Sequence, residues 1–138
     1  MKKNEPINQL VTTSPITVHV NDPVSKVRKI FDEHKVHHVP VISGKKLVGI
    51  VSWSDLLRVS FGEFGNQDGK QLDTILDHTY KLTDIMVANP KSISGSATVR
   101  DAARILAEAN FHALPVVDGE NLVGIVTSTD LLKFLADL

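Results

Sequence analysis

The sequence contains a long internal repeat: residues 11–60 recur as residues 86–135, and the two copies align without a gap. Each residue of the first copy therefore corresponds to the residue 75 positions later. The match is densest where the run Leu-Val-Gly-Ile-Val at residues 47–51 returns at residues 122–126. A gapless duplication predicts two equivalent structural units about a pseudo-twofold axis. We expect any binding site in one unit to have a similar counterpart in the other.

The length of the chain limits how independent the two units can be. The sequence has 138 residues, and a unit of about 50 residues buries too little apolar surface to be comfortably stable alone. We therefore expect the repeats to fold as one module, with repeat 1 at residues 7–60, a linker at 61–81 and repeat 2 at 82–138.

The composition narrows the classes of partner and the compartment. The net charge is −1 and acids and bases are interspersed, which argues against binding to nucleic acid or to a membrane surface. No apolar run approaches the roughly 20 residues that a membrane span requires, and no apolar stretch follows the N-terminus as in a secretory signal. The absence of cysteine excludes disulfides and thiolate chemistry. These features favour a cytoplasmic protein.

Each copy has the pattern of a short strand, a helix, two longer strands and a second helix. In the first copy, Asp22 and Pro23 predict a helix start, with Asp22 as the N-cap. Apolar residues then recur at helical spacing, and the runs 38–42 and 46–52 predict a hairpin closed at Gly44. The pattern predicts a mixed α/β (α+β) fold of two β-α-β-β-α repeats.

Two further helices are indicated by local patterns, one in the second copy and one in the linker. In the second copy, Thr98 and Asp101 have the spacing of a capping box. Within the linker, glycines and polar residues predict a loop, and Leu72, Ile75 and Leu76 predict one short amphipathic helix after it. We assign no chemistry to the linker.

A hydroxyl and a carboxylate, three residues apart, stand at the predicted strand-to-helix turn of both copies. They are Ser52 and Asp55 in the first copy, and Thr127 and Asp130 in the second. A carboxylate there can accept hydrogen bonds from two vicinal hydroxyls, while the helix start offers N–H groups to an anion. The alternative is that both pairs only cap their helices. Duplication copies a cap as readily as a site, so both interpretations stand.

The chain resembles a tandem pair of cystathionine-β-synthase (CBS) domains, often called a Bateman module. The resemblance covers residues 7–60 and 82–138. It is carried by Ser14-Pro15 and Asn89-Pro90, by His38-Val39-Pro40-Val41 and Ala113-Leu114-Pro115-Val116, and by the two Gly-Ile-Val-[Ser/Thr]-x-[Ser/Thr]-Asp segments. It implies two units that pack through their sheets and leave two clefts, which in the family commonly bind adenine nucleotides and sometimes other adenosyl ligands.

The resemblance also implies roles for particular residues. Aspartates hold the ribose hydroxyls, and hydroxyl residues lie near the ribose and phosphate. The segment that leads into each repeat contains the Ser-Pro or Asn-Pro pair, and the backbone directly after that pair frames the base. A basic residue before the Pro-containing strand reaches phosphate. In this sequence the matching positions are Asp55 and Asp130, Ser52 and Thr127, Ile16, Thr17, Lys91 and Ser92, and His37, His38 and His112. Ala113 departs from this pattern because it replaces the equivalent of His38.

The histidines and the tryptophan allow other interpretations. Adjacent residues on a strand point to opposite faces, so His37 and His38 are a poor pair for one metal ion. No thiol or carboxylate beside them has ligand spacing, and we predict no metal. The histidines could have structural or surface roles, or they could contact a phosphate, since imidazole can act both as a donor and as a ligand. Trp53 is expected to cover the edge of the sheet more readily than to stack on a base.

The sequence therefore predicts a stand-alone regulatory module that binds AMP, ADP or ATP as a ligand or energy sensor and requires no cofactor. It lacks a nucleophile–base pair and a phosphate-binding loop with lysine, so we expect no catalysis. The alternatives are a structural dimerisation module with empty clefts, or an enzyme acting on a nucleotide. We also expect a homodimer, through helix faces carrying Phe31, Val36, Leu57 and Val59, and an unidentified regulated protein as a further partner.

Overall fold

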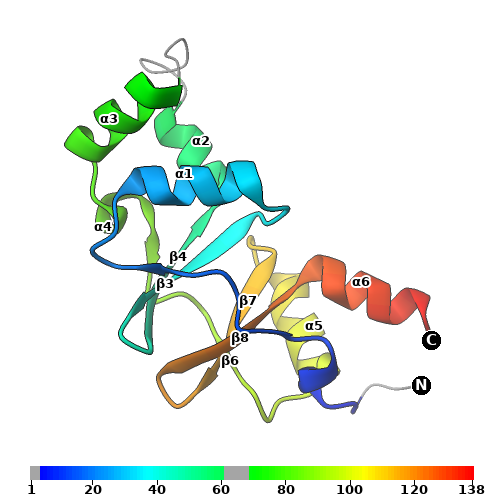
Figure 1. Cartoon of the computed structure of the whole chain (residues 1–138). Coiled ribbons are helices and arrows are strands. Elements are labelled where there is room, and N and C mark those ends of the chain that lie inside the picture. Colours follow the sequence, from blue (N-terminus) through cyan, green and yellow to red (C-terminus); the bar gives the residue numbers. More distant parts are fainter. Residues whose placement is uncertain (1–3, 61–68) are drawn as a thin grey trace. The chain divides into compact units, whose positions relative to one another are not determined.

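The computed structural model describes residues 4–60 and 69–138, and the chain forms two compact units. One unit is the continuous segment Ile16–Asn89. The other combines the stretch up to Pro15 with Pro90–Leu138. The chain thus passes from one unit to the other at the Ser14-Pro15 pair of the first repeat and at the Asn89-Pro90 pair of the second (Figure 1).

The unit Ile16–Asn89 has a four-stranded mixed sheet with helices packed on it. Its elements are β2 (Val18–His19), α1 (Val24–Glu33), β3 (His38–Ser43), β4 (Lys46–Ser52), α2 (Trp53–Ser60), α3 (Gly69–Thr79), α4 (Leu82–Ile85) and β5 (Val87–Ala88). The strand order is β2-β3-β4-β5, with β2 parallel to β3 and the other pairs antiparallel.

The second unit repeats this topology. Its elements are a 3-10 turn (Ile7–Gln9), β1 (Thr12–Thr13), β6 (Ile93–Ser94), α5 (Val99–Glu108), β7 (Ala113–Asp118), β8 (Asn121–Thr127) and α6 (Ser128–Ala136). The order is β6-β7-β8-β1, with β6 parallel to β7. Each element begins 75 residues from its counterpart in the other unit, and among the described elements only α3 has no counterpart.

The elements predicted from the sequence are confirmed, with one correction at the first helix. Both hairpins turn at glycines with φ of +64° and +63°, a conformation that glycine adopts without steric cost. Asp22, however, is not the N-cap of α1, which begins at Val24 after Pro23. Its carboxylate instead accepts a hydrogen bond from the His19 backbone N–H (2.8 Å) and one from Lys26 (3.0 Å). These bonds hold the pKa of Asp22 below its ordinary value.

The lead-in of each repeat adds an edge strand to the sheet of the other repeat, which the sequence did not predict. β1 pairs antiparallel with β8, so that Thr13 lies opposite Gly124. In the same way, β5 pairs with β4, so that Ala88 lies opposite Gly49. Each compact unit is therefore built from parts of both repeats.

These pairings explain the glycine of the repeated Gly-Ile-Val run and give a first prediction. A Cβ on Gly124 would overlap Val11 and would lie 2.9 Å from the backbone oxygen of Thr12, whereas a Cβ on Gly49 would meet only the flexible side chain of Met86. We expect Gly124→Ala to lower the free energy of unfolding by about 1–3 kcal/mol. Gly49→Ala should cost less. Urea denaturation of both variants tests this, and equal losses would contradict it.

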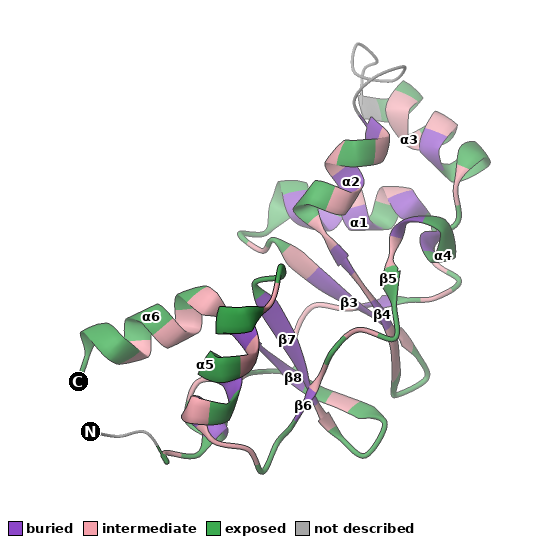
Figure 2. Cartoon of the chain, turned by 180° about the vertical axis from the view of Figure 1, so that it is seen from behind, coloured by how far each residue is buried: buried purple, intermediate pink, exposed green. Residues whose placement is uncertain are grey.

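Each unit has its own hydrophobic core, visible as the buried residues of Figure 2. The core of Ile16–Asn89 includes Val27, Val39, Leu56 and Leu76, so the linker helix α3 contributes to it. The core of the other unit includes Ile7, Ala102, Leu106, Leu114 and Val126. The predicted helix after the linker loop is thus confirmed, while the loop itself lies outside the described residues.

The residues expected at a homodimer contact are largely occupied within their own unit. Phe31 is buried, and Val36 and Val59 pack against the core of Ile16–Asn89. Leu57 is partly exposed. These positions therefore offer little free apolar surface, and homodimerisation remains a prediction.

Candidate functional site

Four segments meet at one end of the sheet in the unit Ile16–Asn89. β2 and β3 are parallel, and β4 is antiparallel to β3. The starts of β2 and β3 therefore lie at the same end as the last residue of β4, Ser52. His38 is paired with Ser52, and the Trp53 N–H donates to the His37 carbonyl at 2.8 Å. Ile16 and Thr17 directly precede β2 and therefore lie at this end of the sheet, where the chain enters the unit.

Ser52 and Asp55 form a reciprocal capping box at the start of α2. The Asp55 Oδ2 atom accepts from the Ser52 backbone N–H (2.8 Å) and from its hydroxyl (2.9 Å). The Asp55 backbone N–H donates to the Ser52 Oγ atom (3.1 Å). The second carboxylate oxygen, Oδ1, accepts from Arg58 at 3.4 Å. The Asp55 side chain is 13% exposed, so the carboxylate is held in place but reachable from solvent.

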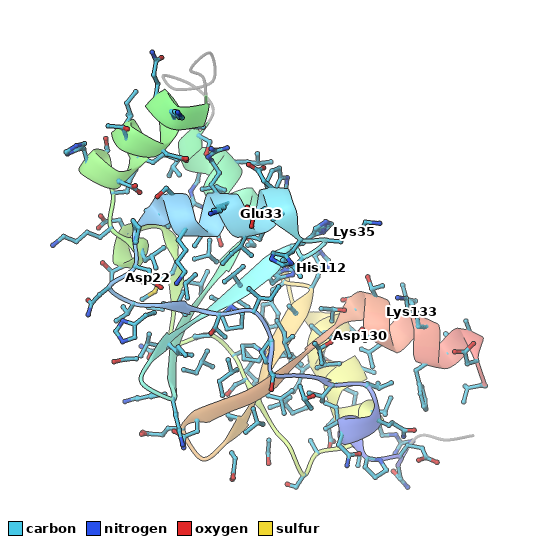
Figure 3. The ribbon with its side chains drawn as sticks, viewed as in Figure 1. Asp22, Glu33, Lys35, His112, Asp130 and Lys133 are labelled. Carbon is cyan, nitrogen blue, oxygen red and sulfur yellow. The ribbon has the colours of Figure 1, made fainter. Side chains whose placement is uncertain are left out.

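The second unit brings the equivalent residues together in the same way. The Thr127 backbone N–H donates to Asp130 Oδ2 (2.8 Å), and the Asp130 N–H donates to Thr127 Oγ1 (3.2 Å). The Ser128 N–H donates to the His112 carbonyl (2.9 Å), so His112 and Asp130 belong to the same end of that sheet (Figure 3). Lys91 and Ser92 precede β6 and enter from the crossing, as their counterparts do.

The two aspartates differ in their second oxygen. Asp55 Oδ1 is paired with Arg58, whereas Asp130 makes no hydrogen bond beyond the capping box with any residue in the described ranges. The residue corresponding to Arg58 is Lys133, and it does not pair with Asp130 within those ranges. Asp130 thus presents an available acceptor beside a helix N-terminus, where N–H groups favour negatively charged ligands.

The aromatic and imidazole side chains near the site have different surroundings. The ring of Trp53 meets that of Phe31 edge to face, with centroids 5.5 Å apart, and is 41% exposed. This contact favours the predicted packing role of Trp53 over base stacking. His37 and His112 are exposed, and His38 is partly buried.

The lead-in segment carries a backbone feature that was not predicted from the sequence. Ser14 and Asn89, which occupy corresponding positions before a proline, both have a φ of +49°. This left-handed conformation costs a non-glycine residue roughly 1–2 kcal/mol, although asparagine tolerates it better than serine does. It changes the direction of the chain where the chain passes from one unit to the other, just before the residues expected to frame a base. The repeated Ser-Pro and Asn-Pro pairs were the available signal.

Residues 4–60 and 69–138 contain no group of three or more histidine, aspartate or glutamate side chains arranged to hold a metal ion. Over the same residues, no helix combines the length and the apolar character needed to cross a bilayer.

Comparison with known proteins identifies the family. A family model described as CBS domain matches the chain twice, at residues 7–62 and 82–137. The chain belongs to the CBS domain family, and the two matches make it a tandem CBS pair, or Bateman module. The resemblance inferred from the repeated motifs is thereby confirmed.

Relatives of known sequence include proteins much longer than this chain. A CBS domain-containing protein of Dictyostelium discoideum is 30% identical, and the match covers 94% of this chain and 90% of that protein. The uncharacterized protein MJ1404 of Methanocaldococcus jannaschii is 28% identical over 99% of this chain. The chain spans 33% of the length of MJ1404 and 43% of that of MJ0188 from the same organism.

Solved structures of CBS pairs share the fold. CBSX2 of Arabidopsis thaliana, in complex with AMP, gives a TM-score of 0.79 at 29% identity, covering 96% of this chain and 97% of that one. The CBS pair of MJ0100, in complex with 5′-methylthioadenosine and S-adenosyl-L-methionine, gives 0.74 at 25% identity, covering 94% and 98%. Both complexes contain an adenosine moiety.

Proposed function

We propose that this CBS pair is a regulatory module that binds an adenine nucleotide or a related adenosyl ligand. The observation that carries the proposal is the repeated pair of a hydroxyl and an aspartate, Ser52 with Asp55 and Thr127 with Asp130, at the same end of each unit's sheet. The aspartate accepts from the two ribose hydroxyls. The hydroxyl residue and the N–H groups of the helix start donate to the phosphate.

The ligands of the structural relatives support this class. CBSX2 is solved with AMP, and MJ0100 with 5′-methylthioadenosine and S-adenosyl-L-methionine. AMP, ADP and ATP are therefore our first candidates, ahead of the sulfur-containing ligands. His37, His38 and His112 contact the phosphates, and the backbone at Ile16-Thr17 and Lys91-Ser92 frames the base.

The same module acts by binding and not by catalysis. Its two aspartates occupy equivalent capping positions, as expected for two copies of a binding site. A catalytic acid and base need different environments to separate their pKa values.

One observation favours a second candidate, a structural module that binds no nucleotide. Each hydroxyl and aspartate already satisfies the other in a capping box, so helix capping alone accounts for both residues. This candidate predicts no ligand response.

Thermal unfolding of the protein with AMP, ADP, ATP, GTP and S-adenosylmethionine distinguishes the two candidates. A ligand at a hundredfold excess over its dissociation constant stabilises the folded state by about 2.7 kcal/mol. We expect the adenine nucleotides to raise the melting temperature and GTP to have little effect. No shift with any adenosyl ligand at millimolar concentration would favour the structural candidate.

The two sites should differ in affinity, because Arg58 occupies the Asp55 carboxylate whereas Asp130 has no such partner in the described residues. The pair is long, at 3.4 Å, and its Arg58 side is exposed, so displacing it costs up to about 1 kcal/mol, which corresponds to about fivefold in affinity. We expect AMP to bind more tightly at Asp130, and Arg58→Ala to narrow the difference.

Calorimetry on Asp55→Ala and Asp130→Ala, each with and without Arg58→Ala, measures this. Lys133→Ala, at the position that corresponds to Arg58, is the matched control and should change neither site. Weaker binding at the Asp55 site after Arg58→Ala would contradict the prediction and assign Arg58 to the ligand.

A further inference from the structure

The loop between the first helix and the Pro-containing strand of each unit lies at the same end of the sheet as the capping box. In the unit Ile16–Asn89 this loop is residues 34–37, between α1 and β3. The Trp53 N–H, at the start of α2, donates to the His37 carbonyl at 2.8 Å. The loop is therefore held beside the helix start that carries the site aspartate.

This loop is rich in side chains that donate hydrogen bonds to phosphate. It contains His34, Lys35 and His37, all exposed, and β3 then begins with His38, which is partly buried. Imidazole N–H groups and the lysine ammonium group are phosphate donors. Lys35 makes no side-chain hydrogen bond or ion pair with any residue that the structure describes (Figure 3). Its ammonium group is therefore available to a ligand.

The acidic residues just before the loop are already paired along α1. Arg28 donates to Asp32 at 3.1 Å, and the Lys29 Nζ atom lies 4.0 Å from the Glu33 carboxylate. Each base lies one helical turn before its acid. These carboxylates therefore offset charges of the helix itself, and the cation of Lys35 stands beyond the end of the helix.

The corresponding loop of the other unit lacks this set of donors. Residues 109–112 read Ala-Asn-Phe-His, and β7 begins with Ala113 where β3 begins with His38. The Ser128 N–H donates to the His112 carbonyl at 2.9 Å, so the loop occupies the equivalent place. Among the side chains of residues 109–112, only those of Asn110 and His112 can donate a hydrogen bond to phosphate.

The second unit has a lysine in a different part of its site. Lys91 directly precedes Ser92 and β6, in the segment expected to frame the base, where the first unit has Ile16. Arg58 and Lys133 occupy corresponding positions in α2 and α6, so they add a cation to both sites. The first unit thus carries its extra cation on the side of the predicted phosphate contacts, and the second carries its own on the side of the predicted base.

Helix capping does not explain the basic loop. Cations are favoured at a helix C-terminus, which is a structural role open to His34 and Lys35. However, α5 ends at the equivalent place with Ala109 and Asn110, and its C-cap N–H bonds back to the helix as that of α1 does. The fold therefore does not require a cation at this position.

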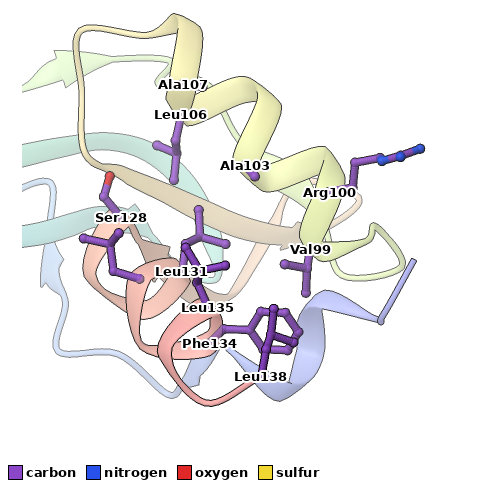
Figure 4. Close-up of a pocket in the computed structure, with 11 residues that line it drawn as sticks. Val99, Arg100, Ala103, Leu106, Ala107, Ser128, Leu131, Phe134, Leu135 and Leu138 are labelled. Atoms are coloured by element: carbon purple, nitrogen blue, oxygen red, sulfur yellow. The ribbon is translucent and has the colours of Figure 1, made fainter. Parts of the chain in front are cut away.

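The open apolar groove between α5 and α6, of about 470 Å³, is unsuited to a phosphate chain (Figure 4). Its lining is aliphatic or aromatic apart from Arg100 and Ser128. A phosphate chain placed there would lose its hydration without finding enough donors. The basic loop of residues 34–37 is the better match to a polyanion.

We propose that residues 34–37 bind the β- and γ-phosphates of ATP, so that the first-repeat site favours the triphosphate whereas the second-repeat site favours AMP. The inference rests on the proposed function, because it takes the ribose to lie at Asp55 and the α-phosphate at the start of α2. Each further phosphate adds negative charge and acceptor oxygens, and Lys35 is the residue that determines the preference. At the second site the same phosphates meet Asn110 and Phe111 and stay largely in solvent.

Variants with one intact site measure the two preferences separately. Asp130→Ala retains the first-repeat site, and Asp55→Ala retains the second. Isothermal titration calorimetry with AMP and with ATP, without Mg²⁺, gives an ATP-to-AMP affinity ratio for each variant. We expect the ratio to be about tenfold higher at the first-repeat site. The difference should shrink as the salt concentration is raised, because exposed charges are screened.

Exchanging the loop residues tests the role of Lys35. In the Asp130→Ala variant, Lys35→Asn introduces the residue of the second repeat and should lower the ATP-to-AMP ratio about fivefold. In the Asp55→Ala variant, Asn110→Lys should raise the ratio at the second site by a similar factor. Lys45→Asn is the matched control, because Lys45 is also exposed but lies in the hairpin turn at the opposite end of the sheet. It should leave the ratio unchanged.

The results separate this inference from the proposed function. Equal ratios at the two sites, or ratios that Lys35→Asn and Asn110→Lys do not change, would overturn the inference, while binding of AMP would still support the proposed function. Equal effects of Lys35→Asn and Lys45→Asn would also overturn it, because the preference would then follow net charge alone. If no adenine nucleotide bound the parent protein, both would be overturned. Circular dichroism checks that each variant is folded.

Discussion

Replacing both Asp55 and Asp130 by alanine is expected to lower the affinity for AMP by about a hundredfold or more while leaving the fold intact. Hydrogen bonds to a charged group contribute about 1.5–3 kcal/mol each, and a ribose diol makes two such bonds to one carboxylate. A loss near 3 kcal/mol corresponds to about 150-fold in the dissociation constant. Isothermal titration calorimetry of the double variant measures this directly.

The fold should tolerate the change, because each aspartate contributes to stability mainly as one half of a capping box. Losing a helix cap costs about 1 kcal/mol, whereas small domains are stable by about 5–15 kcal/mol. The double variant should therefore melt cooperatively at a moderately lower temperature. A variant that binds AMP as tightly as the parent would show that the aspartates only cap their helices.

The chain contains a control for the loss of a cap. Asp101 forms a capping box with Thr98 at the start of α5, with the Thr98 N–H donating to its carboxylate at 2.9 Å. The hydrogen bond from the Thr98 backbone, followed by that from its side chain, lowers the pKa of Asp101. Asp101→Ala thus removes the same local interaction away from the site, and AMP affinity should be unchanged in that variant.

The repeat made most of the fold predictable. Once one copy was assigned, the 75-residue offset fixed the other, and Gly44 and Gly119 marked both hairpins because only glycine turns there without steric cost. The pairing of Ser52 with Asp55 was also readable, since residues three apart at a helix start face each other. These features depend on local sequence, where spacing and conformation are directly linked.

The features that were missed depend on contacts between residues far apart in the sequence. β1 and β5 are two residues long, too short for an alternating pattern, so nothing local showed that they pair with β8 and β4. The left-handed backbone at Ser14 and Asn89 directly follows these short strands, and the repeated Ser-Pro and Asn-Pro pairs were its only signal in the sequence. The ion pair of Arg58 with Asp55 is a different case: the two residues are only three apart, but the sequence offered no reason for Arg58 to prefer this carboxylate over solvent.

The linker shows the same limit. Leu72, Ile75 and Leu76 predicted a helix correctly, but its amphipathic pattern did not show which surface it covers. In the structure, α3 completes the core of Ile16–Asn89. The hydrogen bonds from Arg28 to Asp73 raise the pKa of that guanidinium, as expected for a charge held by a fixed partner. A segment without apparent chemistry thus has a structural role.

The second large effect is therefore expected in the linker helix: Leu76→Ala should lower the free energy of unfolding by about 2–5 kcal/mol. Leu76 is fully buried among core residues of α1 and α2, so the substitution leaves a cavity that rigid neighbours cannot fill. Leu132→Ala, a matched truncation of a leucine that is 65% exposed, should change stability by less than about 0.5 kcal/mol.

Trp53 makes this test specific to the affected unit. It is the only tryptophan of the chain, and its ring contacts Phe31 of α1, so its fluorescence reports the packing of α1 against α2 during urea denaturation. A loss below about 1 kcal/mol for Leu76→Ala would mean that α3 does not cover α1 and α2 in solution.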